Sequence, residues 1–294
     1  MKYILTGEHF GVSRVLGLGN KVDIEESQAL EYLGRDQETT AIVMYVESIK
    51  RPGRFLAVAR EITAEKPVVM LKGGSTEAGK KAAVAHTAAM ASEDRLVDGL
   101  LAQAGVVRIH DYSQLVLAGK ALTMSRLPAG NRVAFLAPSG AMLVCLSDLC
   151  TRLDLALPEL EPSTLQRIQQ ITPPFIRIRN PVDIWAAALA AGVETAYGEG
   201  MAAALEDPNV DAVITIFMLT REMGLPDSYD FVVDLAARHP RKPVLVSFTG
   251  DKTCMEECRD FLEPRGVPTF MQIEEPFHAL SSLCRCAEVR RRPQ

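Results

Sequence analysis

The sequence contains an internal repeat, and this repeat restricts the fold more than any other feature. Four stretches of the first half match four stretches of the second half in the same order. NKVD, which contains Asn20 and Asp23, matches NPVD, which contains Asn180 and Asp183. The other pairs are TTAIVMYVES with VDAVITIFML, KPVVMLKGG with KPVLVSFTG, and AGVVRIHDYSQLVLAGKAL with RGVPTFMQIEEPFHALSSL. Matches in a single order indicate a duplicated structural domain.

Short apolar runs alternate with longer amphipathic segments in both halves. The runs predict strands at residues 12–18, 40–46, 67–71, 106–109, 132–137, 210–217, 243–248 and 268–271. Helical spacing of apolar side chains predicts helices at residues 25–33, 55–64 and 95–104. Apolar strands separated by helices are typical of a parallel sheet that is covered on both faces. With the turn-rich segment LPAGN between the halves, we expect an α/β protein of two doubly wound domains, residues 1–127 and 128–294.

The composition is that of an ordinary globular protein, since 48% of the 294 residues are hydrophobic and 23% are charged. A net charge of −5 argues against nucleic acid as a partner, because clustered Lys and Arg bind phosphate backbones. We expect no membrane partner, because no apolar stretch reaches roughly 20 residues and the N-terminus lacks a signal-peptide pattern. None of the six cysteines has CxxC spacing, so we expect no metal site, reduced thiols and a cytoplasmic location.

The second half begins with a candidate anion-binding turn. The predicted strand at 132–137 leads into Pro138-Ser139-Gly140-Ala141 and an apolar helix. Such a turn presents free backbone N–H groups and the positive end of a helix dipole to an anion. The first half has no counterpart, since Asn180 lies 49 residues after Asn131 whereas 19 residues precede Asn20. We therefore expect the first domain to lack its first strand and that turn.

A glycine loop in the first half leads from the predicted strand at 67–71 to an alanine-rich segment, KGGSTEAGKKAAVAHTAAMAS, that contains His86. The loop resembles a Walker A sequence, but Lys81 stands where a hydroxyl would hold Mg²⁺, so we do not expect nucleotide binding there. Gly73 and Gly74 can still surround an anion. Among the five histidines, His86 alone is framed by small residues after a glycine loop.

An imidazole can act as a nucleophile toward phosphate when a carboxylate fixes its second nitrogen. Glu47 is the candidate partner of His86, because it ends the predicted strand at 40–46 and the carboxyl ends of parallel strands line the binding crevice. The alternative for His86 is a surface histidine on a crossover helix. The alternative for Glu47 is a carboxylate that lies in a loop or caps a helix.

Several stretches in both halves of the sequence resemble the NDP-forming acyl-CoA synthetases. These enzymes belong to the superfamily of succinyl-CoA synthetase and ADP-forming acetyl-CoA synthetase. GVSRVLGLGNKVDIEESQALEYLGRDQETTAIVMYVESI and the His86 segment carry the likeness in the first half. In the second half, VAFLAPSGAMLVCLSD, RNPVDIW and KPVLVSF resemble the family's following domain. The resemblance covers nearly the whole chain, and it implies two flavodoxin-like domains.

The family converts acyl-CoA, ADP and phosphate reversibly to acid, CoA and ATP through an acyl phosphate and a phosphohistidine. The resemblance implies that His86 carries the phosphoryl group, that Glu47 orients it, and that two helix N-termini face it. One of these N-termini matches Ser139, Gly140, Ala141 and Met142. Asp148, Asn180 and Asp183 fall in the motifs of the second domain.

The resemblance also implies partners. The complete enzyme uses CoA, ADP or ATP, Mg²⁺ and phosphate, with an ATP-grasp domain or subunit and a Rossmann-like CoA-binding domain. Neither of these domains is in this sequence, so we expect an oligomer with other chains and no activity of this chain alone.

Three small residues depart from the family pattern. Ala88 and Ser92 replace glycines after His86, and Ser139-Gly140 replaces a double glycine. Alanine narrows the accessible φ range. These changes favour the alternative function, a non-catalytic ligand-binding or regulatory module of the same fold, whereas His86 and Glu47 favour the ligase.

Overall fold

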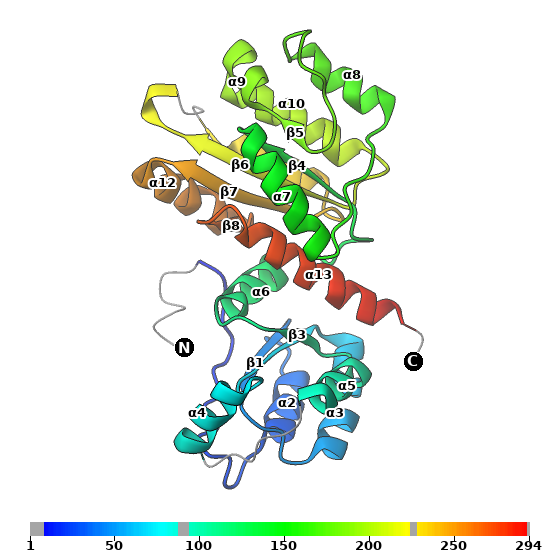
Figure 1. The fold of residues 1–294 in the computed structure, drawn as a ribbon, viewed down its shortest axis with the longest axis vertical. Coiled ribbons are helices and arrows are strands. Elements are labelled where there is room, and N and C mark those ends of the chain that lie inside the picture. Colours follow the sequence, from blue (N-terminus) through cyan, green and yellow to red (C-terminus); the bar gives the residue numbers. More distant parts are fainter. Residues whose placement is uncertain (1–8, 88–93, 224–227, 293–294) are drawn as a thin grey trace. The chain divides into compact units, whose positions relative to one another are not determined.

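The computed structural model describes residues 9–87, 94–223 and 228–292 (Figure 1). The chain divides into two compact units, the first consisting of Met1–Thr123 with Arg285–Gln294 and the second of Met124–Cys284. Among the described residues, unit 1 has a parallel sheet of three strands and unit 2 a parallel sheet of five. The expected α/β fold with two parallel sheets is therefore confirmed.

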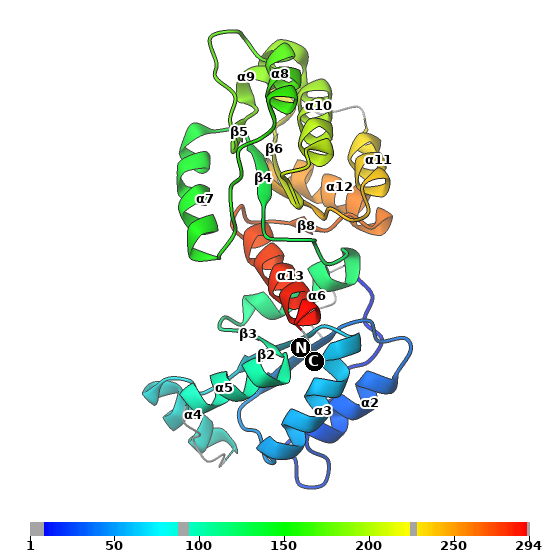
Figure 2. The same cartoon turned by 90° about the vertical axis from the view of Figure 1, so that its right-hand side faces the viewer.

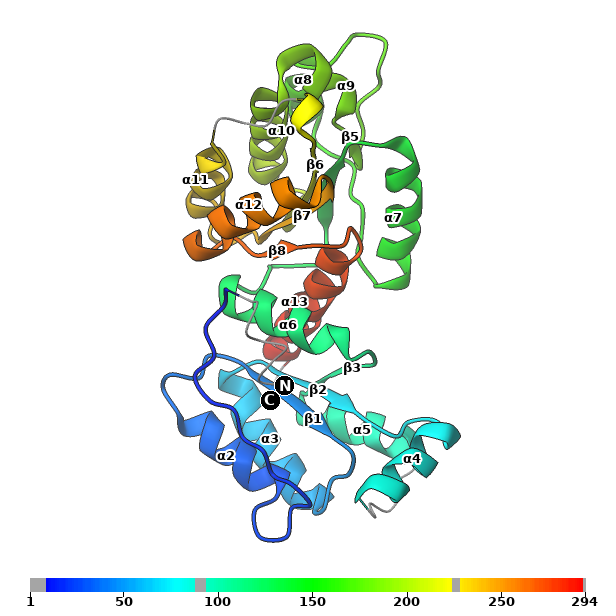
Figure 3. The same cartoon turned by 90° about the vertical axis from the view of Figure 1, so that its left-hand side faces the viewer.

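Unit 1 has the strand order β1 (Ile42–Val46), β2 (Val68–Lys72), β3 (Val107–Ile109). Its helices are α2 (Glu26–Arg35), α3 (Pro52–Glu65), α4 (Glu77–Thr87), α5 (Asp94–Ala104) and α6 (Ser113–Met124). Helices α2, α3 and α5 bury Leu30, Phe55 and Leu101 on one face of the sheet. Helix α6 lies on the other face, where Gly119 approaches Val43 (Figures 2 and 3). All five residues of β2 are buried, as expected for a central strand with both faces covered.

Unit 2 has the order β5 (Val182–Asp183), β4 (Val133–Ala137), β6 (Ala212–Leu219), β7 (Val244–Gly250), β8 (Thr269–Phe270). Its helices are α7 (Gly140–Arg152), α8 (Pro162–Gln170), α9 (Trp185–Ala191), α10 (Val193–Glu206), α11 (Asp230–Arg238) and α12 (Lys252–Leu262). Helices α8 to α12 share one apolar core with the strands. On the opposite face lie α7 and the first part of α13 (Glu275–Arg291) (Figure 2). There the rings of Phe277 and Phe135 pack edge-to-face, with their centroids 5.2 Å apart.

The repeated stretches occupy equivalent strands. Strands β1, β2 and β3 lie in the order that β6, β7 and β8 follow in unit 2, with parallel neighbours throughout. The described part of unit 1 has no strand at the position of β4. Val182 pairs with Leu136 of β4 and is fully buried, whereas its counterpart Val22 is 91% exposed. Burial of this valine thus depends on the neighbouring strand.

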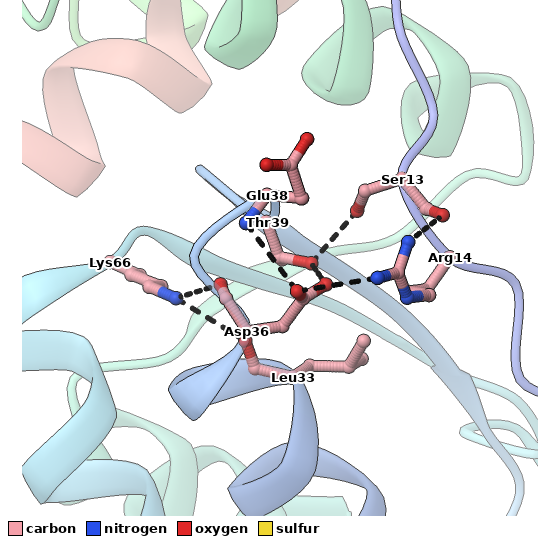
Figure 4. A network of polar contacts seen from close by, with 7 residues as sticks. All are labelled: Ser13, Arg14, Leu33, Asp36, Glu38, Thr39 and Lys66. Carbon is pink, nitrogen blue, oxygen red and sulfur yellow. Dashed lines mark hydrogen bonds and ion pairs between the residues drawn. The ribbon is translucent and has the colours of Figure 1, made fainter.

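The predicted strand at 12–18 is wrong, because these residues form no ladder and Val12, Val15 and Leu16 are exposed. Polar contacts hold the segment instead. Ser13 Oγ lies 2.8 Å from Thr39 Oγ1, and Arg14 forms an ion pair with Asp36 (Figure 4). Apolar composition predicted a strand there, but a strand also needs a partner for its backbone N–H and C=O groups.

Strand β5 was not predicted from the sequence, because two residues are too few to show a hydrophobic period. In the described ranges, no helix is long and apolar enough to cross a membrane.

Candidate functional site

The carboxyl ends of β1 and β2 bring Glu47 and Gly73 to the same edge of the unit 1 sheet. The N–H of Gly73 donates to the carbonyl of Val46 at 2.8 Å, directly before Glu47. Tyr45 Oη donates to Glu47 Oε1 at 3.1 Å, and a Cβ atom on Gly73 would lie 2.9 Å from that hydroxyl. Burial raises the pKa of Tyr45 and the bond to Glu47 adds to this, so the hydroxyl remains a donor. Glycine at position 73 thus leaves room for the tyrosine that holds Glu47.

Lys72 is a buried cation at the end of β2. Its side chain ends β2 with the residue 4% exposed, and Nζ donates to the carbonyl of Gly73 at 2.7 Å. Burial lowers the pKa of this ammonium, Arg108 and Lys80 lower it further, and Asp94 and Glu47 oppose the change. A buried positive charge beside a glycine turn favours an anion at this edge.

The glycine loop then leads into helix α4. Gly74 has φ of 71°, a left-handed conformation that suits glycine. Thr76 caps the helix, because its Oγ1 accepts from the N–H of Gly79 at 3.1 Å. His86 lies in the last turn of α4, and its side chain is outside the described part of the structure. Ala88 and Ser92 lie outside the described residues as well.

Helix α7 in unit 2 begins with an open N-terminus. Ser139 is extended, with φ of −160°, and its side chain makes no capping hydrogen bond. The first intrahelical bond runs from the N–H of Leu143 to the carbonyl of Ser139, so the N–H groups of Gly140, Ala141 and Met142 have no partner within the helix. Because Gly140 and Ala141 are exposed, an anion can reach these groups.

Asp183 lies beside this N-terminus. Its Oδ1 accepts from the N–H of Trp185 at 3.1 Å, and its Oδ2 would lie 3.9 Å from a Cβ atom on Gly140. The structure thus brings Asp183 next to the candidate anion-binding turn. Asp148 is exposed two turns further along α7, on the order of 12 Å from Gly140 by helix rise, and is not at the turn.

Asn180 holds the edge of β4. Its Oδ1 accepts from the N–H of Phe135 at 3.3 Å, and its Nδ2 donates to the carbonyls of Val133 and Pro158 at 2.9 and 3.1 Å. In unit 1 the matching Asn20 and Asp23 are exposed. The same motif therefore makes different contacts in the two units, because the described part of unit 1 has no equivalent of β4.

Sequence reasoning did not single out Lys21, Glu26, Tyr45 or Lys72. One signal was available for Lys72, since a lysine that ends an apolar strand and precedes two glycines is unusual in a core. The burial of Glu26 was not evident from the sequence, because one of its two polar partners, the N–H of Lys50, lies 24 positions away.

Two doubly wound units, one with a glycine loop leading into the His86 helix and one with an open helix N-terminus, define the class of flavodoxin-like ligase domains. Residues 3–122 match the model of the succinyl-CoA ligase like flavodoxin domain, and residues 133–291 match that of the ligase-CoA domain. The chain belongs to the NDP-forming acyl-CoA synthetase family.

Several relatives carry ligase names. The chain is 32% identical to acetate–CoA ligase [ADP-forming] II of Archaeoglobus fulgidus, over 99% of this chain and 43% of that protein. It is also 32% identical to the alpha subunit of acetate–CoA ligase [ADP-forming] II of Pyrococcus furiosus, over 96% of this chain and 61% of the subunit. The chain thus spans about half the length of these relatives and corresponds to one part of them.

The fold has a close counterpart among solved structures. Dinucleotide forming acetyl-coenzyme A synthetase 1 of Ca. Korarchaeum cryptofilum, in complex with phosphate and ADP, matches with a TM-score of 0.87 and 27% identity. The match covers 98% of this chain and 62% of that one.

Proposed function

We propose that this chain is the phosphohistidine-carrying part of an NDP-forming acyl-CoA synthetase. The observation that carries the proposal is the shared sheet edge of unit 1, where Glu47, held by Tyr45, lies beside the glycine loop that leads to His86. The names of the relatives and their longer chains support it.

In this proposal a ring nitrogen of His86 attacks the phosphorus of an acyl phosphate, and the carboxylate of the acid leaves. The phosphoryl group then passes to a terminal oxygen of ADP, which forms ATP and releases the imidazole. Glu47 accepts a hydrogen bond from the second ring nitrogen and thereby fixes which nitrogen reacts. Each unit has its own fixed positive charge for a phosphate group, the Lys72 ammonium in unit 1 and the open N-terminus of α7 in unit 2.

The rest of the reaction belongs to other parts of the enzyme. We propose a Rossmann-like domain that binds CoA and an ATP-grasp domain or subunit that binds the nucleotide with Mg²⁺. The solved relative that contains phosphate and ADP supports the use of these two ligands. We also propose that the chain assembles with these parts in an oligomer. We place this oligomer in the cytoplasm, because all six cysteines are free and thiols stay reduced there.

Labelled ATP tests the proposal directly. The chain is incubated with the ATP-grasp part of the enzyme and ATP labelled at the γ-phosphate, and protein-bound label is measured before and after acid treatment. We expect acid-labile label in the native chain and none in His86→Ala. Unchanged labelling of His86→Ala, or no labelling of the native chain, would sink the proposal.

A sensor module of the same fold is the second candidate. The observation in its favour is the set of replaced glycines, Ala88, Ser92 and Ser139, around the two phosphate-binding segments. Calorimetric titration with phosphate, CoA and ADP separates the two functions. A sensor binds one of these ligands without any transfer of label to His86, whereas the ligase part accepts the label.

A further inference from the structure

The loop that follows Glu47 is tied to a buried ion pair. Glu26, at the start of α2, is fully buried, and its Oε2 lies 2.9 Å from Nζ of Lys21, whose side chain is 13% exposed. Both reach the three residues after Glu47, which connect β1 to α3.

Four hydrogen bonds join the pair to that loop. Lys21 Nζ donates to the carbonyl and to Oγ of Ser48, at 2.5 and 3.0 Å. The N–H of Lys50 donates to Glu26 Oε1 at 2.5 Å, and the ammonium of Lys50 donates back to the carbonyl of Lys21. The loop is therefore held through both main-chain and side-chain groups directly beyond Glu47.

Lys21 has a backbone conformation that lysine rarely adopts. Its φ is 55°, in the left-handed region, where a Cβ atom is crowded. A strained residue at this position persists only when surrounding contacts hold it, and here those contacts are the bonds to Ser48 and Glu26.

The internal repeat provides a comparison for this pair. The positions of Lys21, Glu26 and Glu47 are occupied in unit 2 by Pro181, Ala186 and Met218. Proline cannot take a positive φ, and neither proline nor alanine can form the ion pair. The same fold thus forms without the pair, which is present only in the unit that carries Glu47 and His86.

We propose that Lys21 and Glu26 are positioning residues, which fix the loop 48–50 and thereby the direction of the Glu47 carboxylate. This inference rests on the proposed role of Glu47 toward His86. Its consequence is chemical: with Glu47 held in place, a single ring nitrogen of His86 is presented for phosphorylation.

Chemical phosphorylation tests the inference without any partner. The intact chain is treated with potassium phosphoramidate, which phosphorylates imidazoles, and ³¹P NMR distinguishes the two phosphohistidine isomers. The signal of His86 is identified by its loss in His86→Ala. We expect one isomer in the native chain, and both isomers in Lys21→Met, Glu26→Gln and Glu47→Gln.

Lys66→Met is the matched control, because Lys66 also bonds main-chain carbonyls, those of Leu33 and Asp36, but at the amino end of the sheet (Figure 4). We expect it to keep the single isomer. Lys21→Arg, which retains the positive charge, should also give the single isomer, unlike Lys21→Met. The double variant Lys21→Met with Glu47→Gln should give the same isomer ratio as Glu47→Gln alone, because both changes act through one carboxylate.

Hydrogen exchange gives a readout that is independent of the proposed function. The amide of Lys50, which donates to the paired Glu26, should exchange at least tenfold faster in Lys21→Met than in Lys66→Met or the native chain. Unchanged exchange in Lys21→Met would overturn the inference, as would a single isomer in that variant or two isomers in the native chain. Failure of ATP labelling would remove the proposed ligase function and leave the exchange result standing.

Discussion

Asn180→Ala should destabilise unit 2 at the strand that leads to its candidate anion-binding turn. The side chain forms three hydrogen bonds, two of them to the backbone of β4, the strand that ends directly before the turn at Ser139. Removing the amide leaves the N–H of Phe135 and the carbonyl of Val133 without that partner inside a buried strand.

The size of the effect follows from these bonds. Each hydrogen bond contributes about 1 kcal/mol net, so the loss should total about 2–3 kcal/mol. With a urea dependence of about 2 kcal/mol per molar for a unit of this size, the unfolding midpoint should fall by roughly 1–1.5 M.

Trp185 reports this transition, because it is the single tryptophan of the chain and lies in α9, next to the turn. Urea unfolding followed by its fluorescence therefore measures unit 2. Asn20→Ala is the control, since Asn20 is the equivalent asparagine of unit 1 and is exposed. Its free energy of unfolding, followed by circular dichroism, should change by less than about 0.5 kcal/mol. A midpoint shift below about 0.3 M in Asn180→Ala, or equal shifts in both variants, would refute the reasoning.

Three further variants have expected outcomes. Burial lowers the pKa of Lys72, so the unfolded chain binds this proton more tightly than the folded chain. The charged side chain therefore destabilises the fold at every pH below its folded pKa, and this cost is relieved as the pH rises from the folded pKa to the unfolded pKa. Lys72→Met should therefore raise stability at neutral pH by about 1 kcal/mol in calorimetry, while His86 labelling falls. Asp183→Asn removes a negative charge beside the open N-terminus of α7 and should tighten phosphate binding by roughly two- to fivefold in titration calorimetry. Gly99→Ala lies in α5, where a Cβ atom meets open space, and should stabilise unit 1 by about 0.5–1 kcal/mol in thermal unfolding.

The sequence was sufficient for the strands that lie inside a sheet. Apolar runs at 67–71 and 132–137 became β2 and β4 within one residue at each end, because all their side chains are buried. The run at 12–18 is also rich in valine and leucine, but it has no neighbouring strand among the described residues, and pairing cannot be deduced from composition. Repetition of the sequence did carry pairing information, since it related Val22 to Val182 and so indicated which neighbouring strand the described part of unit 1 does not contain.

The candidate site was predictable from the sequence where its geometry follows from the order of strands, turns and helices along the chain. A helix N-terminus after a strand, as at Ser139, follows from order along the chain, and so does the placement of Glu47 and Gly73 at one edge. The buried ion pair of Lys21 and Glu26 does not, because a charged residue is buried only when distant groups satisfy it. Sequence patterns treat such residues as surface residues.

The repeat also separates what the fold requires from what the site requires. Lys72, buried in unit 1, corresponds to Phe248, which is buried in unit 2, and Gly74 corresponds to Gly250, which also has a positive φ. The backbone turn is thus common to both units, while the buried charge is particular to the first. A buried charge that the duplicated fold replaces with an aromatic ring adds no stability that the fold needs. The same reasoning applies to Lys21 and Glu26. All three charged side chains bond either to the loop after Glu47 or to the glycine loop before His86. The fold does not require these charges, which agrees with the roles proposed above, Lys72 toward an anion and the Lys21–Glu26 pair toward the direction of Glu47.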